Sequence, residues 1–152
     1  MTFRRILIAT DFSPASRPAF RAAVDLASQG RGRLAIVHVL PSVAPVGVGG
    51  YVSARMYEEM EASAREWAEK RLDRLVEEAR GSGIAARALL LEGSAHEAIA
   101  RAARKERADV VVIGTHGRTG LERVLVGSVA ARIIGTAPCP VLTVRPRRGR
   151  KG

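Results

Sequence analysis

Cysteine is almost absent from this sequence, which contains a single one, Cys139. One cysteine cannot form a disulfide within the chain, so no disulfide framework stabilises this fold. Such scarcity is typical of proteins from a reducing compartment, and we expect a cytoplasmic location. Prolines flank Cys139 on both sides, and we interpret it as a small core residue rather than a nucleophile.

Long apolar runs are also missing, because no stretch approaches the roughly 20 residues that a membrane-spanning helix needs. We therefore expect no membrane partner. Residues 1–9 place arginines before apolar side chains and superficially resemble a signal peptide. That apolar part is short and Asp11 follows it, so we interpret it as a first β-strand.

Acidic residues are the minority charge, with 15 Asp and Glu against 25 Lys and Arg and a formal net charge of +10. Several basic residues gather at the end of the chain, where Pro, Gly and Arg cannot bury a core. We expect one domain over residues 1–146 and a disordered basic tail over 147–152. Such a tail can touch nucleic acid through electrostatics alone, but we favour a solvated tail without a nucleic-acid partner.

With 152 residues, the chain is long enough for one α/β domain with a full core and short for two. Apolar runs of strand length alternate with stretches whose apolar residues recur at helical spacing. The predicted strands cover 5–10, 34–40, 84–91, 110–113 and 141–144. Four helices separate them, and this alternation predicts an open five-stranded parallel sheet with helices on both faces.

Helix boundaries have their own signals. Ser13 is placed as an N-cap before Pro14, and Ser94 with Glu97 has the spacing of a capping box. The helix over about 53–80 should pack its apolar positions inward. These are Met56, Met60, Trp67, Leu72, Leu75, Val76 and Ala79.

A glycine-rich loop follows the fourth strand. The spacing is Gly114-x2-Gly117-x9-Gly127-Ser128, and the last helix begins there. Glycine lets backbone N–H groups approach a phosphate, and a helix N-terminus directs unpaired donors at it. The loop matches neither the P-loop nor the dinucleotide-binding fingerprint, which differ in residue types or in position. The spacing therefore indicates a phosphate site, with plain turns as the alternative.

Asp11 follows the first strand, and the common strand orders place that strand centrally, beside the third or the fourth. If the first and fourth strands are neighbours, Asp11 faces the glycine loop across the point where the winding reverses. Because Ser13 already supplies a cap, Asp11 is free to bind ribose hydroxyls or a metal ion. The alternative is that Asp11 merely bonds amides of its own turn.

These motifs together resemble the universal stress protein family over residues 3–146. The opening strand with its aspartate, the glycine loop and the closing strand stand in the family's order. They are Ile6-Leu7-Ile8-Ala9-Thr10-Asp11-Phe12-Ser13, the G-x2-G-x9-G-[S/T] motif at Gly114, Gly117, Gly127 and Ser128, and Ala137 to Val144. The motif is that of the family's ATP-binding branch.

The resemblance implies the strand order 3-2-1-4-5 of the adenine nucleotide alpha hydrolase-like fold. It also implies a site for ATP, or for AMP or ADP, with Mg2+ accompanying the nucleotide. The implied binding residues are Ala9, Thr10, Asp11, Val39, Ile113, Gly114, His116, Gly117, Gly127, Ser128 and Val129. By motif position the first four surround base and ribose, and the last three hold the distal phosphates. Ala130 departs from members with a hydroxyl there.

Catalysis is the weaker hypothesis. His116 would lie near the phosphates and can titrate near neutrality, yet no second carboxylate stands in a recognisable position to orient an attacking water. We therefore assign no catalytic residue and no metal ligand, and expect ATP binding with slow or no hydrolysis in a stress-response regulator. The rival hypotheses are an ATPase or nucleotidyl-transferring enzyme on the same fold and a basic nucleic-acid-associated protein.

The fifth strand lies at the sheet edge in the implied order, where its backbone groups need a partner. The resemblance indicates a homodimer formed by antiparallel pairing of Val141 to Val144 across a two-fold axis. A protein partner that reads nucleotide occupancy is also expected, but the sequence does not identify it.

Overall fold

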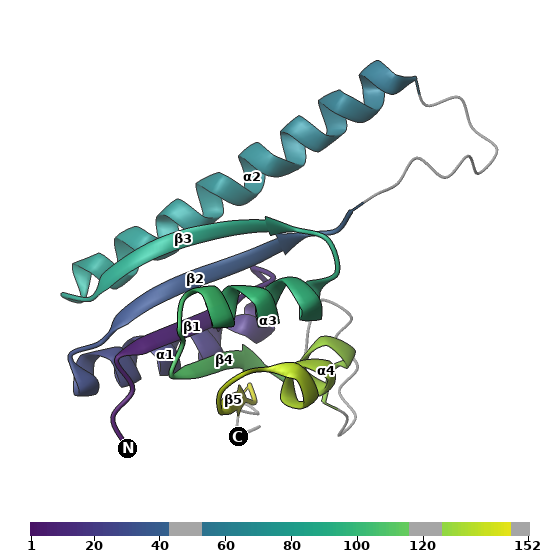
Figure 1. Cartoon of the computed structure of the whole chain (residues 1–152). Coiled ribbons are helices and arrows are strands. Elements are labelled where there is room, and N and C mark those ends of the chain that lie inside the picture. Colours follow the sequence, from purple (N-terminus) through teal and green to yellow (C-terminus); the bar gives the residue numbers. More distant parts are fainter. Residues whose placement is uncertain (43–52, 116–125, 147–152) are drawn as a thin grey trace, which may run out of the picture.

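Five parallel strands form one open sheet in the computed structural model of the chain, which describes residues 1–42, 53–115 and 126–146. The strands are β1 (Arg5–Ala9), β2 (Arg33–Leu40), β3 (Ala85–Glu92), β4 (Val110–Gly114) and β5 (Val141–Val144). Their order across the sheet is β3-β2-β1-β4-β5, as Figure 1 shows. The predicted parallel sheet and its order are confirmed.

Helices cover both faces of this sheet, as predicted. They are the 3-10 turn η1 (Pro14–Ser16) and the helices α1 (Arg17–Gly30), α2 (Ala54–Gly81), α3 (Ala95–Lys105) and α4 (Ser128–Thr136). One core cluster joins the sheet to α1 and α2, for example through Phe20 and Leu72. A second cluster on the other face joins it to α3 and α4, for example through Ile99 and Ile133. Within the described residues, no helix is long and apolar enough to cross a membrane.

The central strand shows why its sequence is apolar throughout. Ile6 and Ile8 belong to the cluster under α1 and α2, whereas Leu7 belongs to the cluster under α3 and α4. Successive side chains point to opposite faces of a strand. A parallel strand covered on both faces therefore needs a continuous apolar run, not an alternating one.

The predicted caps are half right. Ser13 is a cap, but of η1, where its hydroxyl accepts a hydrogen bond from the Ser16 N–H at 3.3 Å. The α-helix begins later, at Arg17. Ser94 occupies the N-cap position of α3 without capping it, because its hydroxyl lies 3.1 Å from Nδ1 of His96. The predicted capping box is therefore wrong.

Helix α2 corrects a second expectation. Met56, Met60 and Trp67 are 51%, 64% and 40% exposed, so they are not core residues. A helix of 28 residues is about 42 Å long, while strands of eight residues such as β3 reach only about 26 Å. The first half of α2 projects beyond the sheet (Figure 1), and the buried side chains begin at Ala68.

Asp109 joins the starts of β1 and β4. One carboxylate oxygen accepts from the backbone N–H groups of Arg4 and Arg5, at 3.0 and 2.8 Å. The other accepts from Nε and an η-nitrogen of Arg5, at 3.2 and 2.7 Å. The Arg5 guanidinium, with these backbone donors, lowers the pKa of Asp109 to about 2, against the opposing effect of desolvation.

We expect Asp109→Asn to lower the free energy of unfolding at neutral pH by about 1–2 kcal/mol, allowing for partial exposure of the pair. The pKa of this carboxyl is lower in the folded state than in the unfolded state. Its contribution is therefore complete above about pH 4 and disappears as the pH falls through about 2. Urea unfolding of both proteins across this range measures the difference. Asp25→Asn, at an exposed position on α1, is the control, and a difference independent of pH would contradict the assignment.

Cys139 agrees with its interpretation as a packing residue. Its side chain is partly buried against the cluster under α3 and α4. Burial raises the pKa of the thiol, and the negative charge of Asp109 raises it further. The group therefore stays protonated at neutral pH, which does not suit a nucleophile.

Candidate functional site

A pocket of about 330 Å³ opens at the carboxyl ends of β1, β2 and β4. β1 pairs with β2 on one side and with β4 on the other, so the winding direction reverses here, where open α/β sheets bind ligands. The lining residues come from these strand ends and from the starts of α3 and α4. They are Ala9, Thr10, Asp11, Ser16, Val37, His38, Val39, Ala95, Ile99, Ile113, Gly114, Gly127, Ser128, Val129 and Ala130.

Nine of the eleven residues implied by the family resemblance line this pocket, and they come from four separate segments of the chain. The other two, His116 and Gly117, lie outside the described residues.

The turn after β1 is held by a network of hydroxyl groups. The Thr10 hydroxyl accepts the Phe12 N–H at 3.0 Å and lies 3.0 Å from the Ser16 hydroxyl. The Ser16 hydroxyl in turn donates to the Ser13 carbonyl at 2.8 Å. Phe12 has a φ of 62°, a left-handed conformation that costs a bulky residue free energy. The network therefore holds a strained turn at the wall of the pocket.

Asp11 lines the pocket and also bonds its own turn. Its Oδ1 accepts the Ser13 N–H at 2.9 Å. The sequence analysis expected the Asp11 carboxylate to have no role in the turn, because Ser13 supplies the cap. In the structure one carboxylate oxygen bonds the turn, with the Ser13 N–H as the donor. The turn interpretation of Asp11 is confirmed, because one carboxylate oxygen bonds an amide of its own turn. The side chain also forms part of the pocket wall, and its binding to ribose hydroxyls or a metal ion stays a prediction.

His38 was not among the predicted site residues, yet it lines the pocket and is 8% exposed. The Thr10 carbonyl can only accept, so Nδ1 of His38 donates to it across 2.8 Å. The imidazole centroid lies 4.3 Å from that of Phe12, and Trp67 lies edge-on to Phe12 at 5.4 Å. His38 thus binds the end of β2 to the strained turn after β1.

The two ends of the glycine loop are joined at its base. The Gly127 N–H donates to the Thr115 carbonyl at 2.6 Å, and the Thr115 N–H donates to Val144 of β5 at 3.0 Å. Gly127 has an ordinary φ of −54°, so its conformation does not require glycine. Space is tight instead, because a Cβ there would lie 3.1 Å from the Thr115 oxygen, which would have to move by a few tenths of an ångström.

The N-terminus of α4 borders the pocket through Ser128, Val129 and Ala130. Its first intrahelical bond runs from the Ala131 N–H to the Gly127 carbonyl at 2.9 Å. The three preceding N–H groups therefore have no carbonyl within the helix to bond, and the helix dipole adds positive potential. This end of the pocket suits an anion.

The sequence could have indicated only some of the lining residues that were not predicted. His38 directly precedes Val39 at the end of a predicted strand, so its position was available from the sequence. Ala95 and Ile99 line the pocket because α3 begins beside the end of β2, which depends on the strand order. No group of three or more possible metal ligands occurs among the residues that the structure describes.

Comparison with known proteins agrees with this geometry. The model of the universal stress protein family matches residues 2–145. Universal stress protein MJ0531 of Methanocaldococcus jannaschii is 34% identical over 143 residues, which is 94% of this chain and 82% of that protein.

Two solved structures are also similar. The structure of hypothetical protein MJ0577 has a TM-score of 0.85 at 24% identity, covering 98% of this chain and all of that one, which shows the shared fold. A universal stress protein from Archaeoglobus fulgidus, solved in complex with dAMP, has a TM-score of 0.65 at 25% identity, covering 95% of this chain and all of that one. The match of the family model along nearly the whole chain shows that this chain belongs to the universal stress protein family.

Proposed function

We propose that this chain binds ATP in the pocket between the ends of β1, β2 and β4 and acts as a nucleotide-dependent stress-response regulator in the cytoplasm. One observation carries the proposal. Nine residues that the family resemblance implies for a nucleotide site, among them Gly114, Gly127 and Ser128 of the glycine motif, line a single pocket at the point where the sheet reverses its winding. The relative from Archaeoglobus fulgidus was solved with an adenine nucleotide, dAMP, which supports the ligand class.

The chemistry of the wall suggests an orientation for the nucleotide. Ala9, Val39 and Ile113 supply apolar surface for the adenine, and the Asp11 carboxylate can accept hydrogen bonds from ribose hydroxyls. The N-terminus of α4 then receives the phosphates. Asp11 is the only carboxylate among the described lining residues, so Mg2+ would be held largely by the phosphates themselves.

Hydrolysis in this proposal is slow or absent. Asp11 and His38 are the ionisable side chains of the described lining, and each already bonds backbone of the turn after β1. A general base must be in reach of the proton that it removes. Binding without fast turnover therefore suits this pocket, and the occupied and empty states of the protein would carry the signal.

We further propose that the protein forms a homodimer through β5. Among the described strands, β5 pairs with β4 alone and is the last in the order β3-β2-β1-β4-β5. An edge strand presents a row of unpaired N–H and carbonyl groups that can bond a second chain. Leu142 in its middle is 37% exposed.

We expect Asp11→Ala to weaken binding of ATP and AMP alike, by on the order of 10- to 150-fold, as for loss of a charged hydrogen bond of about 1.5–3 kcal/mol. Isothermal titration calorimetry with each nucleotide measures the effect. Asp11→Asn keeps the oxygen that accepts the Ser13 N–H and removes only the charge, so it separates ribose binding from the shape of the turn. Asp25→Ala on α1 is the control.

Two results would change the proposal. A loss confined to ATP with Mg2+ would make Asp11 a metal-side residue instead of a ribose ligand. Unchanged affinity for both nucleotides in a folded variant would remove Asp11 from the site. Mass spectrometry of nucleotide released from the purified protein tests the ligand class directly, and a protein without an adenine nucleotide, before or after incubation with ATP, would overturn it.

A further inference from the structure

The positive charge of the fold is concentrated at one edge of the sheet. The described residues hold 19 basic and 14 acidic side chains, a net charge of +5. Seven of these basic side chains and two of the acidic ones lie at the amino ends of the strands. The segments concerned are 1–5, 31–33, 82–87, 105–109 and 137–140. We call them the basic edge. It alone carries +5, so the remaining described residues are balanced.

Most of this charge is not neutralised locally. Of the two acidic side chains, Asp109 pairs with Arg5 and Glu106 pairs with Arg87. The other five cations are exposed and form no ion pair with any described residue. They are Arg4, Arg31, Arg33, Lys105 and Arg107.

Two of these arginines occupy positions that favour glycine. Arg31 follows α1 with a φ of 50°, and Arg107 lies two residues after the end of α3 with a φ of 51°. Glycine adopts this left-handed conformation without steric cost, and helices commonly end on it. Stability alone therefore favours glycine at both sites. A cation also interacts favourably with a helix C-terminus, and this purely structural role is the alternative that the experiment must separate.

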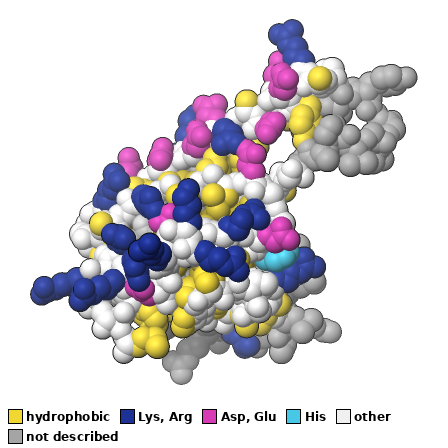
Figure 2. All heavy atoms as spheres, in the orientation of Figure 1, with side chains coloured by type: hydrophobic (Ala, Val, Ile, Leu, Met, Phe, Trp, Pro, Cys, Tyr) yellow, Lys and Arg dark blue, Asp and Glu magenta, His cyan; other side chains and the backbone are white. Residues whose placement is uncertain are grey.

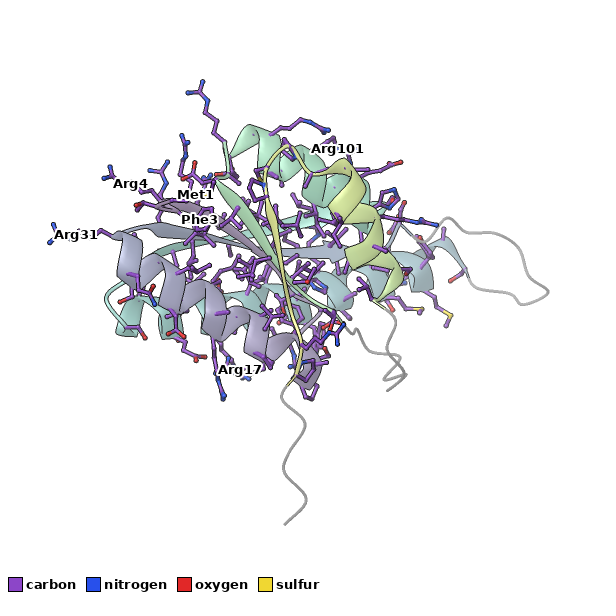
Figure 3. All side chains as sticks on the ribbon, turned by 90° about the horizontal axis from the view of Figure 1, so that it is seen from below. Met1, Phe3, Arg4, Arg17, Arg31 and Arg101 are labelled. Atoms are coloured by element: carbon purple, nitrogen blue, oxygen red, sulfur yellow. The ribbon has the colours of Figure 1, made fainter. Side chains whose placement is uncertain are left out.

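The strand order arranges the cations in a row. Arg87 belongs to β3, Arg31 and Arg33 lead into β2, Arg4 and Arg5 into β1, and Lys105 and Arg107 into β4. Adjacent strands lie about 4.8 Å apart, so the row is roughly 15 Å long. In Figure 2, dark blue side chains lie along the side of the molecule where the strands begin, and others are spread over the rest of this face. Figure 3 shows Arg4 and Arg31 projecting from the same end of the molecule.

We propose that the basic edge binds the phosphate backbone of a nucleic acid without sequence preference. Phosphates along a nucleic-acid strand supply a regular row of like charge, which a row of cations on adjacent strands matches. Four of the five cations that form no ion pair with a described residue are arginines, whose planar fork bonds phosphate oxygens in pairs. Membrane binding normally adds inserted apolar side chains, and Met1 is the only exposed large apolar residue of this edge within the described chain.

This surface is independent of the proposed nucleotide site, because amino and carboxyl ends of parallel strands lie at opposite edges of the sheet. It also differs from the basic tail considered from the sequence, residues 147–152, which lies outside the described residues. Failure of one proposal therefore leaves the other standing.

The test is fluorescence anisotropy of a labelled DNA duplex of mixed sequence, titrated with the full-length chain at several salt concentrations. In the double variant Arg31→Gly, Arg107→Gly both cations are replaced by the residue that the backbone favours, so the variant should fold and melt at an unchanged or higher temperature. We expect affinity at about 50 mM salt to fall on the order of tenfold or more, and the slope of log K against log salt to decrease by about 2. Nucleotide affinity should not change.

The matched control is Arg21→Gln, Arg132→Gln, which removes two exposed cations from α1 and α4 and should preserve both affinity and slope. A chain that ends at residue 146 tests the tail. When the two arginines are replaced in this shortened chain, its affinity for the duplex should fall as it does in the full-length chain. The proposal is overturned if truncation abolishes binding while the double variant binds normally. It is also overturned if anionic phospholipid vesicles or polyglutamate bind and the duplex does not, or if the double variant loses only thermal stability.

Discussion

Gly127→Val is expected to lower the affinity for ATP on the order of a hundredfold or more, the largest effect of any single change in the proposed site. Gly127 is the N-cap of α4, and its N–H closes the base of the glycine loop on the Thr115 carbonyl at 2.6 Å. The three N–H groups proposed to bind phosphate follow directly after it. Losing one or two charge-assisted hydrogen bonds of about 1.5–3 kcal/mol each gives an effect of this size.

The steric reason differs from the one that the sequence suggests. From the motif alone, a side chain at position 127 would fill the space of the phosphate and strain nothing else. In the structure, a Cβ at this position lies 3.1 Å from the Thr115 oxygen. A branched side chain must therefore push apart the end of β4 and the start of α4, which moves the phosphate-binding groups. Overpacking of this kind costs about 1–3 kcal/mol of stability.

Two further variants make the result specific. Gly135→Val places the same side chain in the same helix, where a Cβ meets nothing within 4 Å, and should leave ATP affinity unchanged. Gly127→Ala should give an intermediate loss. Calorimetry with ATP and AMP completes the design, because a contact to distal phosphates predicts a larger loss for ATP. Equal losses for both nucleotides would place the phosphates elsewhere.

The architecture was largely predictable because its determinants are local. Five apolar runs such as Ile6 to Ala9 alternate with helical patterns, and alternation with right-handed crossovers leaves few topologies. The central place of β1 followed from those rules, whereas the choice between the third and the fourth strand as its neighbour needed the family resemblance. The strands could thus be predicted from the chain's own residues, whereas their order could be predicted only from the resemblance to the family.

What escaped prediction depends on tertiary geometry. The helical spacing of Met56, Met60 and Trp67 predicts a buried face, yet spacing cannot show that the sheet ends before the helix does. The bonds of Asp109 to Arg4 and Arg5 join positions more than 100 residues apart, and no local pattern indicates them. The clash at Gly127 depends on Thr115, which lies across the base of the loop.

For the candidate site, too, local sequence signals predicted some residues, and others depend on tertiary geometry. Asp11 and Gly114 were predicted because each stands where a strand ends, and both line the pocket. His38 was missed because a histidine on an apolar strand has no distinctive neighbour in the sequence. Only the fold brings its imidazole to the Thr10 carbonyl and the Phe12 ring.

Thr143→Pro should convert the proposed dimer to a folded monomer. Alternate residues at β5 face β4. The Pro140 carbonyl accepts the Val111 N–H and the Val144 carbonyl accepts the Thr115 N–H, each at 3.0 Å. In a parallel ladder the residues between bond the opposite side. The Thr143 N–H therefore points to the open edge, and proline there removes a donor that β4 does not use.

This register answers a question that the sequence leaves open, namely whether proline at position 143 breaks the dimer or the sheet. Leu142→Pro is the matched opposite, because residue 142 lies in the alternate set that bonds β4, and it should destabilise the monomer itself. Thr143→Val keeps the N–H while it removes the hydroxyl, and it should remain a dimer. Sedimentation velocity over a concentration series measures the association, and circular dichroism checks the fold. A folded Thr143→Pro protein that dimerises with undiminished affinity would show that association uses another surface, for which the exposed side of α2 is the next candidate.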